Sequence, residues 1–158
     1  MAKMCRMRIV VQRVTSAAVT VAGAVVGSID NGLVVLVGVA AGDDVEAART
    51  LARRVAGLRI FANADGRFDR SLADVGGSVL AVSQFTLITD ARRPKGARPD
   101  FSGAARPDVA EPLYNVFCDA LRAHGVPVES GVFGASMQVA LVNDGPVTVI
   151  LEADGAGD

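Results

Sequence analysis

The sequence predicts an α/β (α+β) fold in which two helices cover a mixed β-sheet within a single domain. Apolar residues make up 51% of the 158 residues, so the chain can bury a sizeable core. Aromatic residues contribute only 4% and Trp is absent, which leaves Val, Leu, Ile and Ala to fill the core and favours a sheet-rich structure. β-Branched segments alternate with two segments of helical periodicity, in the order strands, helix, strands, helix, strands.

The first part of the chain is expected to form strands. β-Branched residues fill residues 9–14, 17–21 and 25–29. The dipeptide Asn31-Gly32 is a strong turn signal, and residues 33–39 after it are apolar almost throughout. Such a run predicts a strand that is buried on both faces of the sheet.

Two helices are expected to follow. The first covers residues 45–57, after a capping segment at 42–44. The second covers residues 108–124 and contains Pro112, which is expected to disturb its first turns. Two helices cannot cover both faces of so many strands, so either the sheet curls into a barrel or a dimer forms. The further strands are expected at residues 58–61, 67–72, 78–85, 128–130, 137–142 and 147–151.

Residues 90–106 differ from the rest of the chain because they show no periodicity. At 17 residues, this segment is longer than most structureless connections in compact domains, so we expect it to be either functional or disordered. Its basic residues are Arg92, Arg93, Lys95, Arg98 and Arg106.

Charge and cysteine content set few limits on function. The formal net charge is −1, so any contact with RNA must come from a local patch. Cys5 and Cys118 lack the spacing of a metal site, and no apolar stretch is long enough to span a bilayer, so a reduced, cytoplasmic protein is expected. Within the predicted domain (1–158), residues 1–6 are expected to be an N-terminal extension and residues 153–158 a flexible tail.

Side chains that serve common catalytic mechanisms are few. The one histidine, His124, is expected at a helix C-terminus, where it complements the helix dipole, and no GxSxG motif precedes a helix. Clusters of His and Cys are lacking, as is a Gly-rich phosphate loop, so no metal or cofactor is expected. If the chain is an enzyme, it works largely without titrating side chains.

Two polar segments are candidate elements of a site. Ser83-Gln84-Phe85-Thr86 ends a predicted buried strand, where its polar groups either satisfy the strand terminus or line a pocket. Asn143-Asp144-Gly145-Pro146-Val147-Thr148 consists of ordinary turn residues. A Gly-Pro bond can also be cis, and such a corner can point two backbone carbonyl groups out of the sheet. Neither segment is specific by itself.

In their order along the chain, these motifs resemble those of the D-aminoacyl-tRNA deacylases (D-tyrosyl-tRNA deacylases). The resemblance covers Met7 to about Glu152. Its motifs are Gln12-Arg13-Val14, then Gly76-Gly77-Ser78 leading into Ser83-Gln84-Phe85-Thr86-Leu87, and Met137-Gln138-Val139 leading into residues 143–148.

The resemblance implies a barrel-like mixed sheet and a homodimer that deacylates D-aminoacyl-tRNA and mischarged glycyl-tRNA at the subunit interface. Gly145 and Pro146 would form a cis corner that reads chirality in the partner's pocket. Ser83, Gln84, Phe85 and Thr86 would surround the 3′-terminal adenosine and the scissile carbonyl. We expect the ribose 2′-OH of the substrate to assist a water molecule that Thr86 positions. Further substrate-binding residues would be Asn143, Val147, Thr148, Phe133 and Met137 (core packing is the alternative for the last two), and tRNA phosphates would contact Arg92, Arg93, Lys95 and Arg98.

The chain departs from the family pattern at two positions. Asp100 stands where a small Ser is common and adds negative charge near the expected RNA path, and Ser136 stands where an acidic residue is usual. Two other functions stay open: a catalytically inactive tRNA-binding module, and a general esterase for D-amino acid esters. The intact motifs argue against the first, and the absence of a side-chain base argues against the second.

Overall fold

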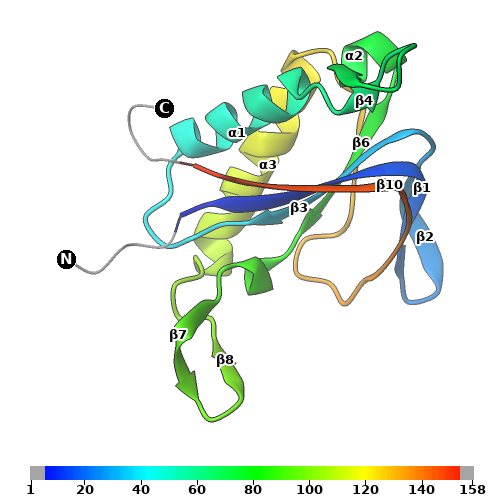
Figure 1. Cartoon of the computed structure of the whole chain (residues 1–158). Helices are drawn as coiled ribbons and strands as arrows, with labels where there is room; N and C mark the ends of the chain where they lie inside the picture. The colour runs from blue at the N-terminus through cyan, green and yellow to red at the C-terminus, as the bar shows by residue number, and fades with distance from the viewer. Residues whose placement is uncertain (1–5, 154–158) are drawn as a thin grey trace.

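The structure is a computed structural model that describes residues 6–153, apart from the side chains of residues 90–95 (Figure 1). Its main sheet is mixed, because β6 runs parallel to β3 and β9, whereas β1 is antiparallel to β2, β3 and β10. The strand order is β10-β1-β3-β6-β9, and β2 also pairs with β1. The six strands are β1 (Arg8–Val21), β2 (Ala24–Ile29), β3 (Gly32–Gly38), β6 (Ser78–Ser83), β9 (Val128–Ser130) and β10 (Gln138–Glu152).

The sheet curls into a nearly closed barrel and carries an apolar cluster on each face. β3 belongs to both clusters: Val35 and Val37 pack on the helix side, and Val34 packs on the other side with Val19 and Leu80. The predicted burial of this strand on both faces is therefore confirmed, as is the predicted fold class with its barrel-like sheet.

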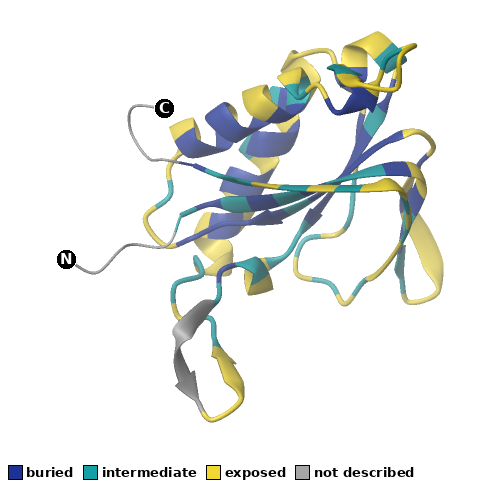
Figure 2. Cartoon of the chain, in the orientation of Figure 1, coloured by how far each residue is buried: buried dark blue, intermediate teal, exposed yellow. Residues whose placement is uncertain are grey.

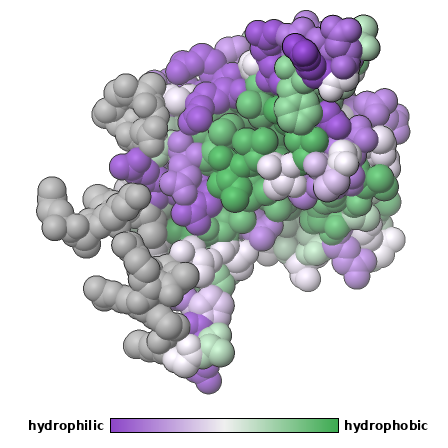
Figure 3. Space-filling view, viewed as in Figure 1, coloured by the Kyte–Doolittle hydropathy of each residue, from purple (hydrophilic) through white to green (hydrophobic). Residues whose placement is uncertain are grey.

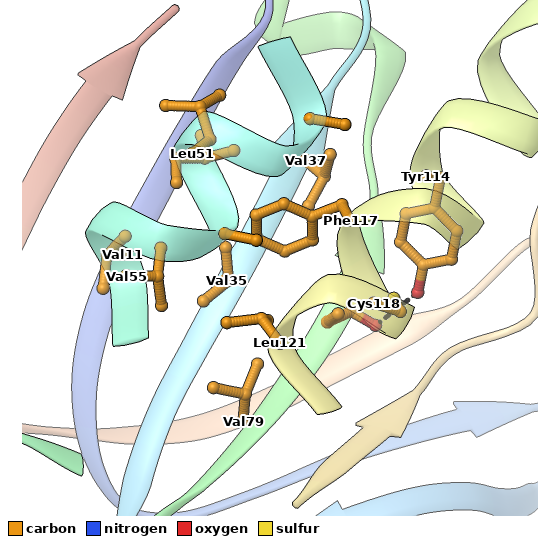
Figure 4. Close-up of a cluster of buried hydrophobic side chains, with 14 of the residues drawn as sticks. Val11, Val35, Val37, Leu51, Val55, Val79, Tyr114, Phe117, Cys118 and Leu121 are labelled. Carbon is orange, nitrogen blue, oxygen red and sulfur yellow. Dashed lines mark hydrogen bonds between the residues drawn. The ribbon is translucent and has the colours of Figure 1, made fainter. Parts of the chain in front are cut away.

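Two long helices, α1 (Val45–Gly57) and α3 (Pro107–Ala123), lie together on one face of the sheet (Figure 1). α1 begins where the side chain of Asp44 accepts a hydrogen bond from the N–H of Ala47. Between the helices and the sheet, Phe117 packs among Leu51, Val37 and their neighbours, which form the continuous buried layer (Figures 2 and 4). α3 runs without interruption through Pro112, so the expected disturbance is absent.

A third helix, α2 (Leu72–Val75), was not predicted. It begins with a capping box between Ser71 and Asp74 in a segment expected to be partly extended. Ahead of it, the short strands β4 (Phe61–Ala62) and β5 (Phe68–Arg70) form a small hairpin.

The prediction of two strands and a turn at residues 137–151 was wrong. These residues form one strand, β10, which pairs with β1 on both sides of a large bulge. Gln12 pairs with Thr148 and Val14 with Asn143, so residues 144–147 of β10 face the single residue Arg13 of β1. The turn residues of this segment therefore form a bulge and not a reversal, because β1 continues as one strand opposite both halves. β1 also continues through residues 15 and 16, so the two β-branched segments 9–14 and 17–21 belong to one strand.

The prediction of an irregular segment at residues 90–106 was also wrong in part. β7 (Asp90–Lys95) and β8 (Arg98–Asp100) form an antiparallel hairpin that projects from the sheet (Figure 1). Pro94 and Pro99 concealed this hairpin in the sequence. In a two-stranded ribbon each strand has an unpaired edge, so proline is tolerated there.

Candidate active site

A cavity of about 670 Å³ opens at the end of β6. Its walls come from the chain after β6, the segment between β8 and α3, and the segment between β9 and β10. None of the described residues that line it has an ionisable side chain. They are Val39, Val82, Ser83, Gln84, Phe85, Thr86, Phe101, Ala104, Ala105, Pro107, Ala110, Phe133, Gly134, Ala135, Met137 and Val139.

The segment Ser83 to Thr86 lies along this cavity because the chain turns sharply after β6. The N–H of Gln84 donates to the carbonyl oxygen of Val37 at 2.7 Å, and a 3-10 helix, η1 (Phe85–Leu87), follows at once. The turn packs closely on β3: a Cβ at Gly38 would lie 2.8 Å from the Cβ of Leu87. Gly38 therefore permits the close approach that brings the segment to the mouth of the cavity.

The polar groups of this segment are held by one another. The side-chain amide of Gln84 donates to Oγ1 of Thr86 at 3.1 Å, and the hydroxyl of Thr89 donates to the carbonyl oxygen of Thr86. The N–H groups of Phe85 and Thr86 stand at the start of η1, where a 3-10 helix has no internal acceptor for them. These two backbone donors belong to Thr86 and to the residue before it.

Aromatic side chains form two walls of the cavity. The ring of Phe85, which is 58% exposed, meets the edge of Phe101 at a centroid distance of 5.5 Å. Phe133 packs against Tyr114, whose hydroxyl donates to the carbonyl oxygen of Ala81 at 2.8 Å. Burial raises the pKa of Tyr114 far above its usual range, so this hydroxyl stays protonated and is a structural donor. Met137, also predicted, lines the cavity as well.

The Gly145-Pro146 corner lies in the β10 bulge, and its peptide bond is cis. Asn143 orders the bulge: its side chain accepts from the N–H of Val147 and donates to Oγ1 of Thr148, each at 3.1 Å. Gly145 and Pro146 are exposed, and neither contributes to the cavity of its own chain. The two predicted parts of the site are thus separate within one protomer.

Arg13 holds the bulge from the opposite strand. Its Nε donates to the carbonyl oxygen of Asp144 at 3.1 Å, and its Nη1 donates to the carbonyl oxygen of Ile60 at 2.9 Å. The carboxylate of Asp144 lies 3.5 Å from Nε, and the Arg13 side chain is only 13% exposed. The guanidinium therefore links the residue before Gly145 to the chain ahead of the β4–β5 hairpin.

The expected phosphate-binding residues are only partly visible. Arg98 is exposed on β8, whereas the side chains of Arg92, Arg93 and Lys95 lie outside the described residues. The structure thus leaves this part of the predicted site as a prediction.

Sequence reasoning missed several contributors to the site. Phe101, Ala104 and Ala105 line the cavity because a bridge between Ala40 and Ala104 draws their segment to the end of β3. Arg13 was noted only as part of a motif.

Comparison with known proteins identifies the family. The family described as D-Tyr-tRNA(Tyr) deacylase matches residues 10–152. The chain belongs to this family. D-aminoacyl-tRNA deacylases from Chloroflexus aurantiacus, Thermomicrobium roseum and Thermus aquaticus are 56%, 58% and 56% identical to the chain over 147 residues. The match covers 93% of this chain and 91%, 94% and 95% of theirs. The family resemblance predicted from the motifs is confirmed.

Two solved structures share the fold of this deacylase family member. The c-Myc DNA Unwinding Element Binding Protein aligns with a TM-score of 0.84 and 39% identity, over 92% of this chain and 97% of its own. A probable eukaryotic D-amino acid tRNA deacylase aligns with a TM-score of 0.78 and 21% identity, over 92% and 98% of the two chains. The second likeness bears on the fold alone.

None of the helices among residues 6–153 has the length and apolar character needed to cross a membrane. Within the same residues, His, Cys, Asp and Glu form no group of three or more that could hold a metal ion.

Proposed function

We propose that this member of the deacylase family hydrolyses the ester bond between a D-amino acid and the 3′-terminal adenosine of tRNA, in the cytoplasm. The products are the free D-amino acid and the tRNA. The observation that carries this proposal is the cavity itself. It is large enough for an aminoacylated nucleoside, it ends at Ser83 to Thr86, and none of its described lining residues ionises. Such a site suits a substrate that brings its own reactive hydroxyl, as the 3′ end of RNA does.

We propose that two copies of the chain share each site. Gly145 and Pro146 project from β10 and do not line the cavity of their own protomer, so they are free to enter the cavity of another. The face crossed by β10 and β1 carries an apolar area that would otherwise face water (Figure 3). Its exposed apolar residues include Val142, at 56%, and Ile150, at 61%. Burial of such a patch in a two-fold dimer would stabilise the pair.

The corner would distinguish handedness by steric exclusion. Backbone atoms around Gly145 are fixed by Asn143 and Arg13, so they cannot rotate away from a substrate as a side chain can. We propose that these atoms bind the α-amino group and occupy the space that an L side chain would need. Glycine has no side chain to exclude, so mischarged glycyl-tRNA would also be hydrolysed.

The chemical step would depend on the backbone and the substrate. The N–H groups of Phe85 and Thr86 would stabilise the oxyanion that forms when water attacks the carbonyl carbon. The ribose 2′-OH would accept a proton from this water and pass its own proton to O3′, so the bond between the carbonyl carbon and O3′ breaks and O3′ leaves as a hydroxyl. Thr86 has no base beside it among the described residues of the cavity, so its hydroxyl would position the water and not attack.

Single-turnover deacylation tests this function. D-Tyr-tRNA should be hydrolysed rapidly and mischarged Gly-tRNA measurably, while L-Tyr-tRNA should survive. A protein that binds D-Tyr-tRNA without hydrolysing it would be the inactive tRNA-binding module. One that hydrolyses D-tyrosine methyl ester as fast as D-Tyr-tRNA would be a general esterase.

We propose that the β7–β8 hairpin binds tRNA phosphates through Arg92, Arg93, Lys95 and Arg98. Phosphate contacts carry little sequence information, which suits an enzyme that acts on many tRNAs. Replacing Arg92, Arg93 and Lys95 with Ala should reduce the slope of log Kd against log salt by about two to three, since each lost contact removes about 0.9. A slope equal to that of the unmodified protein would show that these residues are only solvated.

A further inference from the structure

Phe68 is a large apolar side chain in an unusual position. It lies on β5 and is 58% exposed, although the chain has only six phenylalanines to fill its core. Its ring centroid lies 5.7 Å from Cζ of Arg13, the residue that holds the Gly145-Pro146 bulge. A guanidinium at this distance from an aromatic face is attracted by the ring. The exposed ring therefore has a specific partner, and that partner contacts the site.

Hydrogen bonds of the β4–β5 hairpin fix the backbone that carries Phe68. The side chain of Asn63 accepts from the N–H groups of Asp65 and Arg67, and the N–H of Asn63 donates to the carbonyl oxygen of Arg67 at 2.8 Å. On the other side of the ring, Arg59 forms an ion pair with Asp69 and also donates to its carbonyl oxygen. The residues on both sides of Phe68 are thus fixed by hydrogen bonds.

The contact between Phe68 and Arg13 matters because few other groups hold the Arg13 side chain in place. Its two hydrogen bonds reach the carbonyl oxygens of Asp144 and Ile60, and both lie on backbone. The Asp144 carboxylate is half-exposed at 3.5 Å, so its attraction is weakened by water. The Arg13 side chain is only 13% exposed, and the ring of Phe68 lies 5.7 Å from its Cζ, so the ring adds a third contact to the two hydrogen bonds. A Cβ placed on Gly145 would lie only 3.2 Å from Nη2 of Arg13. The guanidinium is therefore close enough to Gly145 for its displacement to move the Gly145-Pro146 corner.

We infer that Phe68 is a positioning residue for the reading of chirality, because it holds the Arg13 guanidinium against the backbone of the Gly145-Pro146 corner. This inference rests on the proposed function and extends it to the β4–β5 hairpin, which contributes nothing to the cavity. Loss of the ring would lower kcat for the D substrate, because a displaced Gly145-Pro146 corner no longer holds the substrate in its reactive orientation. Loss of one cation–π contact is expected to reduce kcat about five-fold, which corresponds to about 1 kcal/mol.

A double-mutant cycle tests this inference. Phe68→Ala should lower kcat for D-Tyr-tRNA about five-fold with KM unchanged, and Phe68→Trp, which keeps a ring face, should restore it, whereas Phe68→Leu should not. In an Arg13→Ala background, Phe68→Ala should have no further effect, because the residue through which it acts is gone. Val45→Ala, another exposed apolar position that is 38% exposed on α1, is the matched control and should retain full kcat. Equal penalties in both backgrounds, or an unchanged kcat for Phe68→Ala, would overturn the inference.

A second measurement separates this inference from the function on which it rests. The Nε–H of Arg13 can be followed by NMR in the protein without any tRNA. Its exchange with solvent should be slow in the unmodified protein and in Phe68→Trp, and several-fold faster in Phe68→Ala. Equal exchange in all three proteins would overturn the inference whatever their activity. An unmodified protein that shows slow exchange but no deacylation would contradict the proposed function and support the role of the ring.

Discussion

Gly145→Ala gives the sharpest prediction, because the structure shows what the added methyl group would meet. Gly145 has φ +130°, a backbone conformation that L residues rarely adopt. An added Cβ would lie 2.7 Å from Cγ2 of Val147, 3.1 Å from its backbone nitrogen and 3.2 Å from Nη2 of Arg13. Backbone strain of about 1–3 kcal/mol and a similar cost of overpacking can be relieved only if the bulge moves.

The expected result is a loss of activity that far exceeds the loss of stability. A displacement of the corner by about 1 Å should lower kcat/KM for D-Tyr-tRNA on the order of 100-fold. The bulge is at the surface and can move, which relieves the overpacking and leaves about 1–3 kcal/mol of backbone strain. Tm should therefore fall by no more than about 10 °C, since each 1 kcal/mol lowers Tm by about 2–4 °C in a chain of this size. Single-turnover deacylation and thermal unfolding of the same samples measure both quantities.

Gly125→Ala is the matched control for this prediction. Gly125 follows α3 with φ +83°, so an alanine there would also strain the backbone. A Cβ at this position would meet nothing within 4 Å. It should lower Tm by a few degrees and leave deacylation intact. Near-normal turnover of D-Tyr-tRNA by Gly145→Ala would refute the reasoning, because the corner would then tolerate the group that the geometry excludes.

Three further predictions concern the cavity and the core. Thr86→Ala should slow deacylation about ten-fold without abolishing it, because the hydroxyl positions water and is not the nucleophile; a fully inactive variant that still binds substrate would favour a covalent mechanism. Phe117→Ala should lower the free energy of unfolding by about 3–5 kcal/mol in a denaturant titration, because this ring is fully buried between the helices and the sheet, and a cost below 1 kcal/mol would contradict that packing. Burial raises the pKa of the Cys118 thiol, so in a Cys5→Ser variant iodoacetamide should label Cys118 only as fast as the protein unfolds, and labelling at the rate of a free thiol would contradict its burial. The pKa of the Cys118 thiol is therefore higher in the folded protein than in the unfolded chain. The unfolded chain loses the thiol proton first, so the free energy of unfolding should decrease as pH rises above about 8.5.

The elements with a strong local signal could be predicted from the sequence. The apolar run 33–39 required a strand buried on both faces, and the structure has one in β3. Asp44 marked the start of α1, because an N-cap depends on a few neighbouring residues, and the predicted end at Gly57 agrees with the structure. That the chain leaves the core near Ser83 could likewise be predicted, since a buried strand here meets consecutive polar residues. The predicted strand 78–85 was too long, because β6 ends at Ser83 and a 3-10 helix begins at Phe85.

The bulge in β10 could not be predicted because it depends on the partner strand. Asn143 to Pro146 have the composition of a turn. They form a bulge because β1 pairs with β10 on both sides of them. The contribution of Ala104 was hidden for a similar reason, since its bridge to Ala40 joins segments that lie far apart in sequence. The role of Arg13 required the positions of both Asp144 and Ile60, which no local pattern gives.

The central claim is that the corner of one protomer completes the cavity of another, and subunit mixing tests it most directly. Gly145→Ala removes the corner, and Ala104→Phe fills the cavity, so each variant alone should be inactive as a dimer. After the two are unfolded and refolded together, half of the dimers pair one variant with the other, and each such dimer has one site built from an intact corner and an intact cavity. About one quarter of the unmodified activity for D-Tyr-tRNA should therefore return, as a two-fold shared site requires. Mixed dimers that stay as inactive as the two parents would contradict the claim.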